Sequence, residues 1–171
     1  KFDAISLMPT NLYGPKDNYK LNESHVMAAL IKKFYEAKIQ NLEKVICWGT
    51  GKPLREFLYV EDFAEACLFT LENWNIDNIH APKNKDGNPL YWLNVGSNYE
   101  ISIFDLSKKI AQIVGFKGEI VWDNNKPDGT YRKKLDSSHI NKLGWVAKTD
   151  LDVGIRRTLA IFQEELKMNI V

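Results

Sequence analysis

The sequence predicts an α/β fold, because short apolar runs typical of strands alternate along the chain with segments that have helical spacing. The first of these runs ends at Pro9 and is followed by a polar loop and then a helix, the order found in an open α/β sheet. The alternation resumes at Lys44 and continues almost to the end of the chain. A chain of 171 residues is long enough for one domain with a core, or for part of a larger protein.

The first predicted element is a buried strand over residues 1–7, and proline cannot donate to a sheet ladder, so the strand should end by Pro9. Residues 10–18 are rich in turn formers and hydrogen-bonding side chains, and we expect a loop there. A helix is predicted over about residues 24–38, with His25 in its first turn beside the loop. This arrangement is typical of a ligand site at the end of a strand.

The middle of the chain is predicted to form two strands, a helix and a surface loop. The strands cover residues 44–48 and 55–60, with a glycine-rich turn over 49–53 between them. The helix covers residues 62–72, and the polar segment 75–90 is expected to be the loop. The helix should turn these residues inward: Phe63, Ala66, Cys67, Thr70 and Leu71.

The last part of the chain continues the alternation. Ser102 should cap a helix that Gly115 stops. The other expected elements are a buried strand over 91–95, a strand over 119–122, a polar and basic loop over 124–134, and helices over 137–143 and 151–167.

The composition excludes several classes of function. The 23 basic and 22 acidic residues give a net charge of +1, so we expect no nucleic-acid partner and no acidic membrane surface as partner. No apolar run approaches the roughly 20 residues of a membrane span, and we expect no signal peptide. Cys47 and Cys67 lack metal-ligand spacing, so we expect no metal site and a reducing, cytoplasmic location. The abrupt start within a strand suggests part of a longer protein.

Several residues that can bind a ligand lie at the ends of predicted elements. Arg55 offers a planar donor fork suited to phosphate, and Trp48 could stack on a base. A second basic loop carries Lys126, Asp128 and Lys133. Taken singly, each has an ordinary structural interpretation: Trp48 as core, Arg55 as a surface ion pair, and the lysines as solvated charges.

Five strings of sequence resemble the GDP-L-fucose synthase family of the extended short-chain dehydrogenases/reductases. They are LMPTNLYGPKDN, SHVMAAL, WGTGKPLREFLYVEDFAEA, LNVGSNYEISI and KPDGTYRKKLD, and together they span nearly the whole chain. REFLYVEDFA alone would indicate only the wider sugar-nucleotide epimerase/dehydratase superfamily. PTNLYGP with SHV and KPDGT is more specific.

The resemblance implies that residues 1–171 form the C-terminal part of such an enzyme, with late strands of the Rossmann sheet and a small α/β substrate-binding domain. The family's glycine-rich turn and Tyr-x-x-x-Lys pair lie upstream of the PTNLYGP string and are not in this chain. The chain alone is therefore expected to be inactive. The resemblance also implies a homodimer for the full-length protein.

The family reaction is the NADPH-dependent 3,5-epimerisation and 4-reduction of GDP-4-keto-6-deoxy-D-mannose to GDP-L-fucose. The resemblance implies that His25 is the acid of the epimerisation. It also implies that NADP(H) lies against Pro9, Thr10, Asn11, Leu12 and His25, and that the GDP-sugar is held by Lys33, Trp48, Arg55, Asp128 and Lys133.

Two other functions stay open at this point. The first is another nucleotide-sugar epimerase, reductase or dehydratase of the same superfamily, which a comparison of GDP with UDP or dTDP binding would distinguish. The second is a non-catalytic module that binds a nucleotide sugar, since half an active site cannot turn over. An upstream glycine-rich turn and Tyr-x-x-x-Lys pair would exclude the module.

Overall fold

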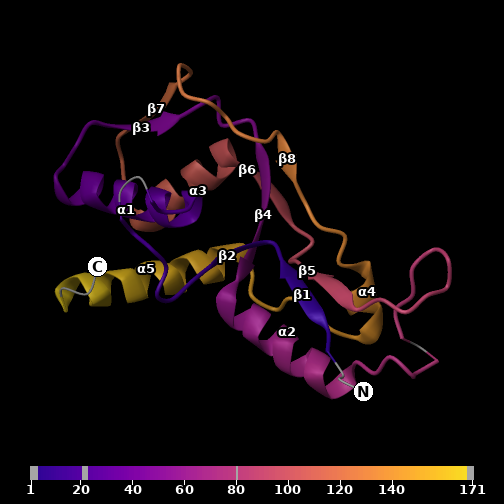
Figure 1. Ribbon diagram of the computed structural model, residues 1–171. Coiled ribbons are helices and arrows are strands. Elements are labelled where there is room, and N and C mark those ends of the chain that lie inside the picture. The colour runs from indigo at the N-terminus through magenta and orange to yellow at the C-terminus, as the bar shows by residue number, and fades with distance from the viewer. Residues whose placement is uncertain (1–3, 21–22, 80, 169–171) are drawn as a thin grey trace.

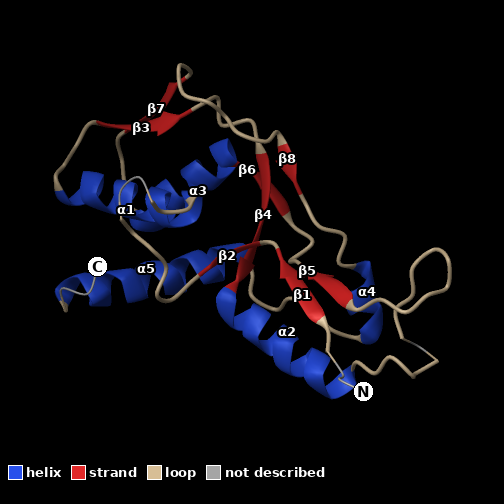
Figure 2. Cartoon of the chain, viewed as in Figure 1, coloured by secondary structure: helices blue, strands red, loops and turns tan. Residues whose placement is uncertain are grey.

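The computed structural model describes residues 4–20, 23–79 and 81–168, and Figures 1 and 2 show that helices and strands alternate along them. The first elements are β1 (Ser6–Pro9), β2 (Asn11–Tyr13), α1 (Val26–Ile39), β3 (Lys44–Trp48), β4 (Leu54–Tyr59) and α2 (Val60–Asn73). They are followed by β5 (Trp92–Val95), β6 (Glu100–Ser102), α3 (Ile103–Val114), β7 (Glu119–Asp123), β8 (Arg132–Lys133), α4 (Ser138–Leu143) and α5 (Leu151–Lys167). No helix in these ranges is both long and apolar enough to cross a membrane.

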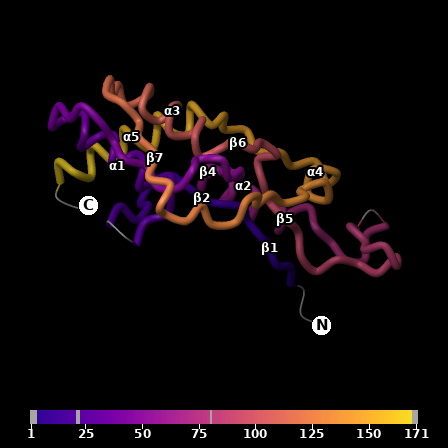
Figure 3. Tube along the Cα trace, turned by 90° about the horizontal axis from the view of Figure 1, so that it is seen from above, coloured from indigo at the N-terminus to yellow at the C-terminus, as the bar shows by residue number. Residues whose placement is uncertain are grey.

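The described strands form three small sheets, of which the one around β4 is the largest. β4 pairs in parallel with β2 and β8 and antiparallel with β6. β1 pairs in parallel with β5, and β3 pairs in parallel with β7. Figure 1 shows β4 running through the middle of the molecule, with α1, α3 and α5 on one side and α2 and α4 toward the other. The view from above in Figure 3 shows the same division.

Two hydrophobic cores lie on the two sides of β4, and the strand's own alternation explains why. Phe57 and Tyr59 point into the core that α1, α3 and α5 build, whereas Leu58 points into the core of α2, α4 and β5. Successive side chains of a strand face opposite sides, so one strand can serve both cores. The larger core includes Phe34 and Phe162, which are fully buried.

The predicted ends of the helix after Ser102 are confirmed. The Ser102 hydroxyl accepts a hydrogen bond from the Asp105 amide at 3.0 Å, which satisfies one free donor of the first turn of α3. Gly115 follows the helix with a φ of 81°, in the left-handed region that glycine adopts without strain.

The prediction of a loop over 75–90 is also confirmed, since its described residues contain no helix and no strand.

Three predictions about the N-terminal and central elements were wrong. β1 covers Ser6–Pro9 where a strand over residues 1–7 was predicted, and in the described part of the chain it is an exposed edge that pairs only with β5; residues 1–3 of the predicted strand lie outside the described residues. Asn11–Tyr13 forms a strand where a loop was predicted, since it finds a partner in β4. Leu71, predicted to point inward, is 77% exposed, whereas Ala66 and Thr70 of the same helix are buried as predicted.

Two further short strands, β6 and β8, lie in segments that carry no strand signal. They are three and two residues long, and both form by pairing with β4. Such short pieces depend on a partner strand that is distant in sequence, so local periodicity does not reveal them.

Gly154 in α5 packs against the ring of Tyr13, and we expect a methyl group there to be strongly unfavourable. A Cβ atom at Gly154 would overlap the Tyr13 hydroxyl and lie 2.8 Å from its Cζ atom. Gly154→Ala should lower the free energy of unfolding by about 1–3 kcal/mol, as overpacked cores do. Urea unfolding measures this loss. Tyr13→Phe in the same protein should recover part of it, and a Gly154→Ala variant as stable as wild type would contradict the packing.

Candidate functional site

A cavity of about 190 Å³ lies where the start of α1, the end of β3, the start of β4 and the basic loop meet. Its wall carries three of the residues that the sequence singled out: Trp48, Arg55 and Asp128. Val26, the neighbour of His25, also lines it. The other lining residues are Gly51, Pro53, Ile103 and Pro127. The cavity therefore joins an aromatic ring, a guanidinium group and a carboxylate within a largely apolar wall.

The Asp128 carboxylate ties the basic loop to the turn after Trp48. It accepts hydrogen bonds from the Thr50 amide at 2.6 Å and from the Thr50 hydroxyl at 2.7 Å. A side chain at Gly49 would overlap this carboxylate, and Gly49 has a φ of 75°, so the position requires glycine on both counts. The glycine-rich turn is thus part of the site because it lets Asp128 approach the backbone.

We expect the bonds between Asp128 and Thr50 to break only when the pH falls below 3.8, the ordinary pKa of an aspartate. The pKa of Asp128 lies below its ordinary value of 3.8, chiefly because Thr50 donates its hydroxyl and amide to the ionised form. Because the pKa of Asp128 is lowered, its contact with Thr50 stabilises the loop at pH values above the ordinary pKa. This stabilisation is lost as the pH falls through the lowered pKa. The NMR shift of the Thr50 amide should therefore titrate with a midpoint below 3.8. Asp128→Asn should abolish this titration, and a midpoint above the ordinary value would contradict the contact.

Arg55 and Lys133 are direct neighbours across the pairing of β4 with β8. Arg55 is half-buried, and its Nη1 atom donates to the Leu54 carbonyl oxygen at 2.8 Å. Among the ion pairs of the described residues, none involves Arg55, so the interpretation as a surface ion pair is wrong. The remaining donors of this guanidinium group are available to an anion at the cavity.

Trp48 is 59% exposed, so its interpretation as a core residue is wrong. The Lys126 ammonium lies 5.4 Å from the centroid of its ring, within the range of a cation–π contact. Lys33 reaches the same strand from α1, since its Nζ atom donates to the Ile46 carbonyl oxygen at 2.9 Å. An exposed indole beside the Lys126 ammonium suits a planar group that carries negative charge nearby.

The segment Pro9–Leu12 contains the end of β1 and the start of β2. The Thr10 hydroxyl and the Asn11 side-chain amide both donate to the Glu56 carbonyl oxygen, at 3.1 and 2.7 Å. These two side chains hold the segment against β4, next to Arg55, while Pro9 is exposed. The geometry therefore gives Thr10 and Asn11 a structural task, and any ligand would meet mainly the backbone and the exposed proline.

His25 is exposed and precedes the first residue of α1 with extended backbone angles, so its imidazole is accessible. The charge of Asp17, a residue of the predicted loop over 10–18, interacts with His25. Burial raises the pKa of the Asp17 carboxyl, against the opposite effects of the Asn18 amide and His25. Within the described residues its Oδ2 atom is buried without a hydrogen-bond partner. No sequence pattern signals this relation, because it arises only when the loop folds back onto the helix start.

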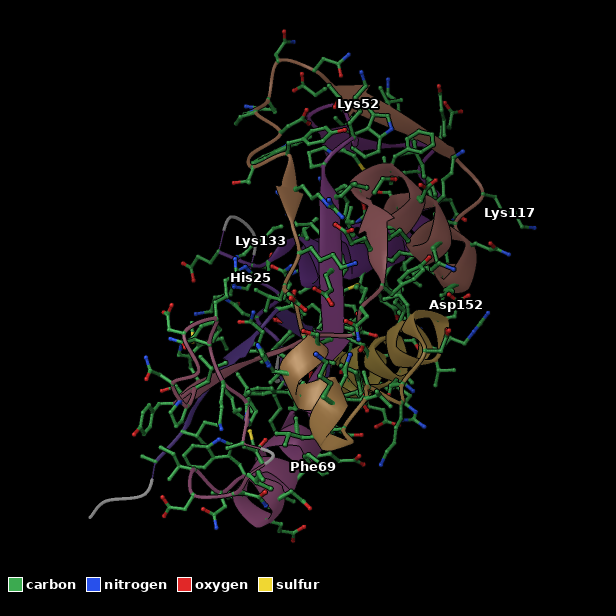
Figure 4. The ribbon with its side chains drawn as sticks, turned by 90° about the vertical axis from the view of Figure 1, so that its right-hand side faces the viewer. His25, Lys52, Phe69, Lys117, Lys133 and Asp152 are labelled. Atoms are coloured by element: carbon green, nitrogen blue, oxygen red, sulfur yellow. The ribbon has the colours of Figure 1, made fainter. Side chains whose placement is uncertain are left out.

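His25 and Lys133 lie on the same side of β4 (Figure 4). Figure 4 shows His25 and Lys133 on one side of β4 and Asp152 on the other. The structure thus brings Trp48, Arg55 and Asp128 to one cavity, with Lys133 beside Arg55. Lys33 is linked to this group through β3.

Comparisons with known proteins find relatives over nearly the whole chain. Residues 1–80 match the NAD dependent epimerase/dehydratase family. The chain is 46% identical over 165 residues to the probable GDP-L-fucose synthase 1 of Oryza sativa subsp. japonica, covering 96% of this chain and 46% of that protein. It is 42% identical over 163 residues to the GDP-L-fucose synthase of Escherichia coli (strain K12), covering 95% and 49%. The chain spans about half the length of the curated relatives it matches.

Solved structures share the fold. A GDP-L-fucose synthetase from Naegleria fowleri superposes with a TM-score of 0.81 at 29% identity, over 98% of this chain and 48% of that one. A GDP-6-OMe-4-keto-L-xylo-heptose reductase from C. jejuni superposes with a TM-score of 0.80 at 31% identity, over 94% and 54%. The predicted α/β fold of the epimerase/reductase type is confirmed.

Proposed function

The chain is related to GDP-L-fucose synthases of the NAD-dependent epimerase/dehydratase family, and from this relationship we propose the activity of the full-length protein. It converts GDP-4-keto-6-deoxy-D-mannose to GDP-L-fucose, by epimerisation at C3 and C5 and reduction at C4. The observation that carries the proposal is the single cavity lined by Trp48, Arg55 and Asp128. Three chemically distinct groups that the resemblance assigns to the GDP-sugar meet there.

In this proposal the nucleotide part of the substrate occupies the cavity and the strands beside it. Trp48 offers an exposed aromatic face on which the base can stack. Arg55 binds the diphosphate with its free donors, and Lys133 and Lys33 add positive charge from the neighbouring strand and helix. Asp128 shapes this part of the site by holding the turn after Trp48.

His25 acts as the acid in the epimerisation steps. A ketone at C4 acidifies the protons on C3 and C5, so inversion needs a base on one face of the sugar ring and an acid on the other. An imidazole suits proton transfer near neutral pH, because its unperturbed pKa is about 6.5. The exposed position of His25 at the start of α1 leaves its ring free to approach the sugar.

The residues Pro9–Leu12 fit one wall of a site for NADP(H). The hydrogen bonds from Thr10 and Asn11 to the Glu56 carbonyl oxygen hold their backbone. Pro9 is exposed and offers an apolar surface. When bound, NADPH supplies the hydride that reduces C4. A nicotinamide cofactor also agrees with the NADP-bound structure of the N. fowleri relative.

A second candidate keeps the 4-reduction of a GDP-sugar and changes the sugar. The C. jejuni relative is a reductase of a GDP-heptose, and it shares the fold closely. A GDP-sugar 4-reductase with another hexose or heptose as substrate would use the same cavity for the nucleotide. The two candidates differ in the sugar that is turned over and in whether epimerisation at C3 and C5 accompanies the reduction at C4.

The experiment is to incubate the full-length protein with NADPH and GDP-4-keto-6-deoxy-D-mannose and to follow the absorbance of the reduced nicotinamide. We expect oxidation of NADPH and GDP-L-fucose as the product. Residues 1–171 alone should be inactive, and light scattering should find the full-length protein as a homodimer. Turnover only of a GDP-heptose would favour the second candidate, and binding of GDP-sugars without turnover would favour a non-catalytic module.

A further inference from the structure

The side chain of Glu56 is an acidic group buried at the junction of several segments of the site. It lies in the middle of β4, and its exposed fraction is 0%. One carboxylate oxygen, Oε1, accepts from the Asn98 amide at 2.7 Å, and the other, Oε2, accepts from the Leu135 amide at 3.1 Å. Both donors are backbone groups, from segments 42 and 79 residues away.

A carboxylate is the group best suited to this place. Burying a charge is unfavourable unless hydrogen bonds compensate for lost water, and two amide donors do so here. A glutamine side chain has one acceptor oxygen and would turn an NH₂ group toward the second amide. The surroundings fit the carboxylate closely, since a side chain at Gly96 would overlap it.

The contacts of Glu56 extend to both ligand-binding parts of the site. Leu135 follows β8, the strand that carries Lys133, and the basic loop with Asp128 precedes that strand. The Glu56 carbonyl oxygen receives Thr10 and Asn11 of the proposed cofactor segment. Arg55 precedes Glu56 on the same strand. The backbone carbonyl thus serves the cofactor side, and the carboxylate serves the substrate side.

We propose that Glu56 is a positioning residue. Its carboxylate holds β8 and the basic loop in register with Arg55, so that the diphosphate of the GDP-sugar meets both Arg55 and Lys133. This inference rests on the proposed function for the identity of the ligand, but its geometric part does not. Glu56 itself is buried and touches neither substrate nor cofactor. Its effect should therefore appear in substrate affinity and in the order of the 131–136 segment.

The test compares Glu56→Gln with Asp62→Asn in the full-length enzyme. Asp62 is a matched control, because it is also buried and its carboxylate accepts two backbone amides, from Lys148 at 3.2 Å and Thr149 at 2.8 Å. These donors precede α5 and are not part of the cavity. We expect Glu56→Gln to raise the KM for the GDP-sugar and the calorimetric Kd for GDP about tenfold, with kcat changed less than about threefold. Asp62→Asn should leave both constants within about twofold of wild type.

A loss of folded enzyme would lower kcat and leave KM unchanged, so the split between the two constants separates positioning from mere stability. Equal KM and Kd values in Glu56→Gln and Asp62→Asn would overturn the proposal. Glu56→Asp keeps the charge but is too short to reach both amides, and it should show the same split. If neither Glu56 variant folds, the residue is required for the fold and the proposal is wrong.

Hydrogen exchange without ligand separates this inference from the proposed function. Glu56→Gln should speed exchange of the Leu135 amide and its neighbours over 131–136, whereas Asp62→Asn should speed exchange around Lys148 and Thr149. A wild-type protein that ignores GDP would refute the proposed function but leave this readout intact. Unchanged exchange at 131–136 in Glu56→Gln would refute the role of Glu56 even if the enzyme is active.

Discussion

Replacing His25 with glutamine is expected to lower the rate of epimerisation in the full-length enzyme by about 10²–10⁴, the usual contribution of a general acid or base. Glutamine keeps the size and polarity of the side chain but cannot exchange a proton near neutral pH. The change lies on an exposed side chain that makes no cap hydrogen bond, so α1 should fold as before. The measurement is the incorporation of solvent deuterium at C3 and C5, with NADPH binding measured in parallel and expected to change far less.

His139 offers a matched control for this experiment. It lies in α4, beside a separate hollow that it shares with Lys142 and Leu143. His139→Gln should incorporate deuterium at the wild-type rate. If His25→Gln also does so, the assignment of His25 as the acid is wrong.

Arg55→Ala is expected to weaken the binding of the GDP-sugar by one to two decades in Kd while leaving NADPH affinity nearly unchanged. Hydrogen bonds to charged groups contribute roughly 1.5–3 kcal/mol, which corresponds to this range. The guanidinium lines the cavity and has donors beyond the one bound to the Leu54 carbonyl. Calorimetric titration with GDP and with NADPH measures both affinities on the same protein.

Two further variants sharpen this result. Arg55→Lys keeps the charge but loses the planar fork, so it should recover only part of the affinity. Arg156→Ala removes an equal charge from the exposed side of α5 and should have no effect on GDP. Equal losses for GDP and NADPH in Arg55→Ala, or no loss at all, would show that Arg55 does not bind the substrate.

Much of the local structure could be predicted from the sequence, because it depends on neighbours along the chain. The strand Lys44–Trp48 has the predicted bounds, and the helix from Ser102 to Gly115 begins and ends as the capping side chain and the glycine indicate. The candidate residues Trp48, Arg55 and Asp128 were also named from the sequence, and they meet in one cavity. Trp48 ends β3 and Arg55 lies near the start of β4, whereas Asp128 lies in the loop between β7 and β8.

Only the tertiary structure decided which side chains face solvent and which distant segments meet. It placed Trp48 at the surface, made β1 an exposed edge, and formed β6 and β8 on β4. The Glu56 carboxylate binds amides 42 and 79 residues away, and such contacts leave no periodic trace in the sequence. The physical reason is that apolar spacing indicates the kind of element, helix or strand. Its partners depend instead on which long-range hydrogen bonds and packed surfaces the whole chain can satisfy together.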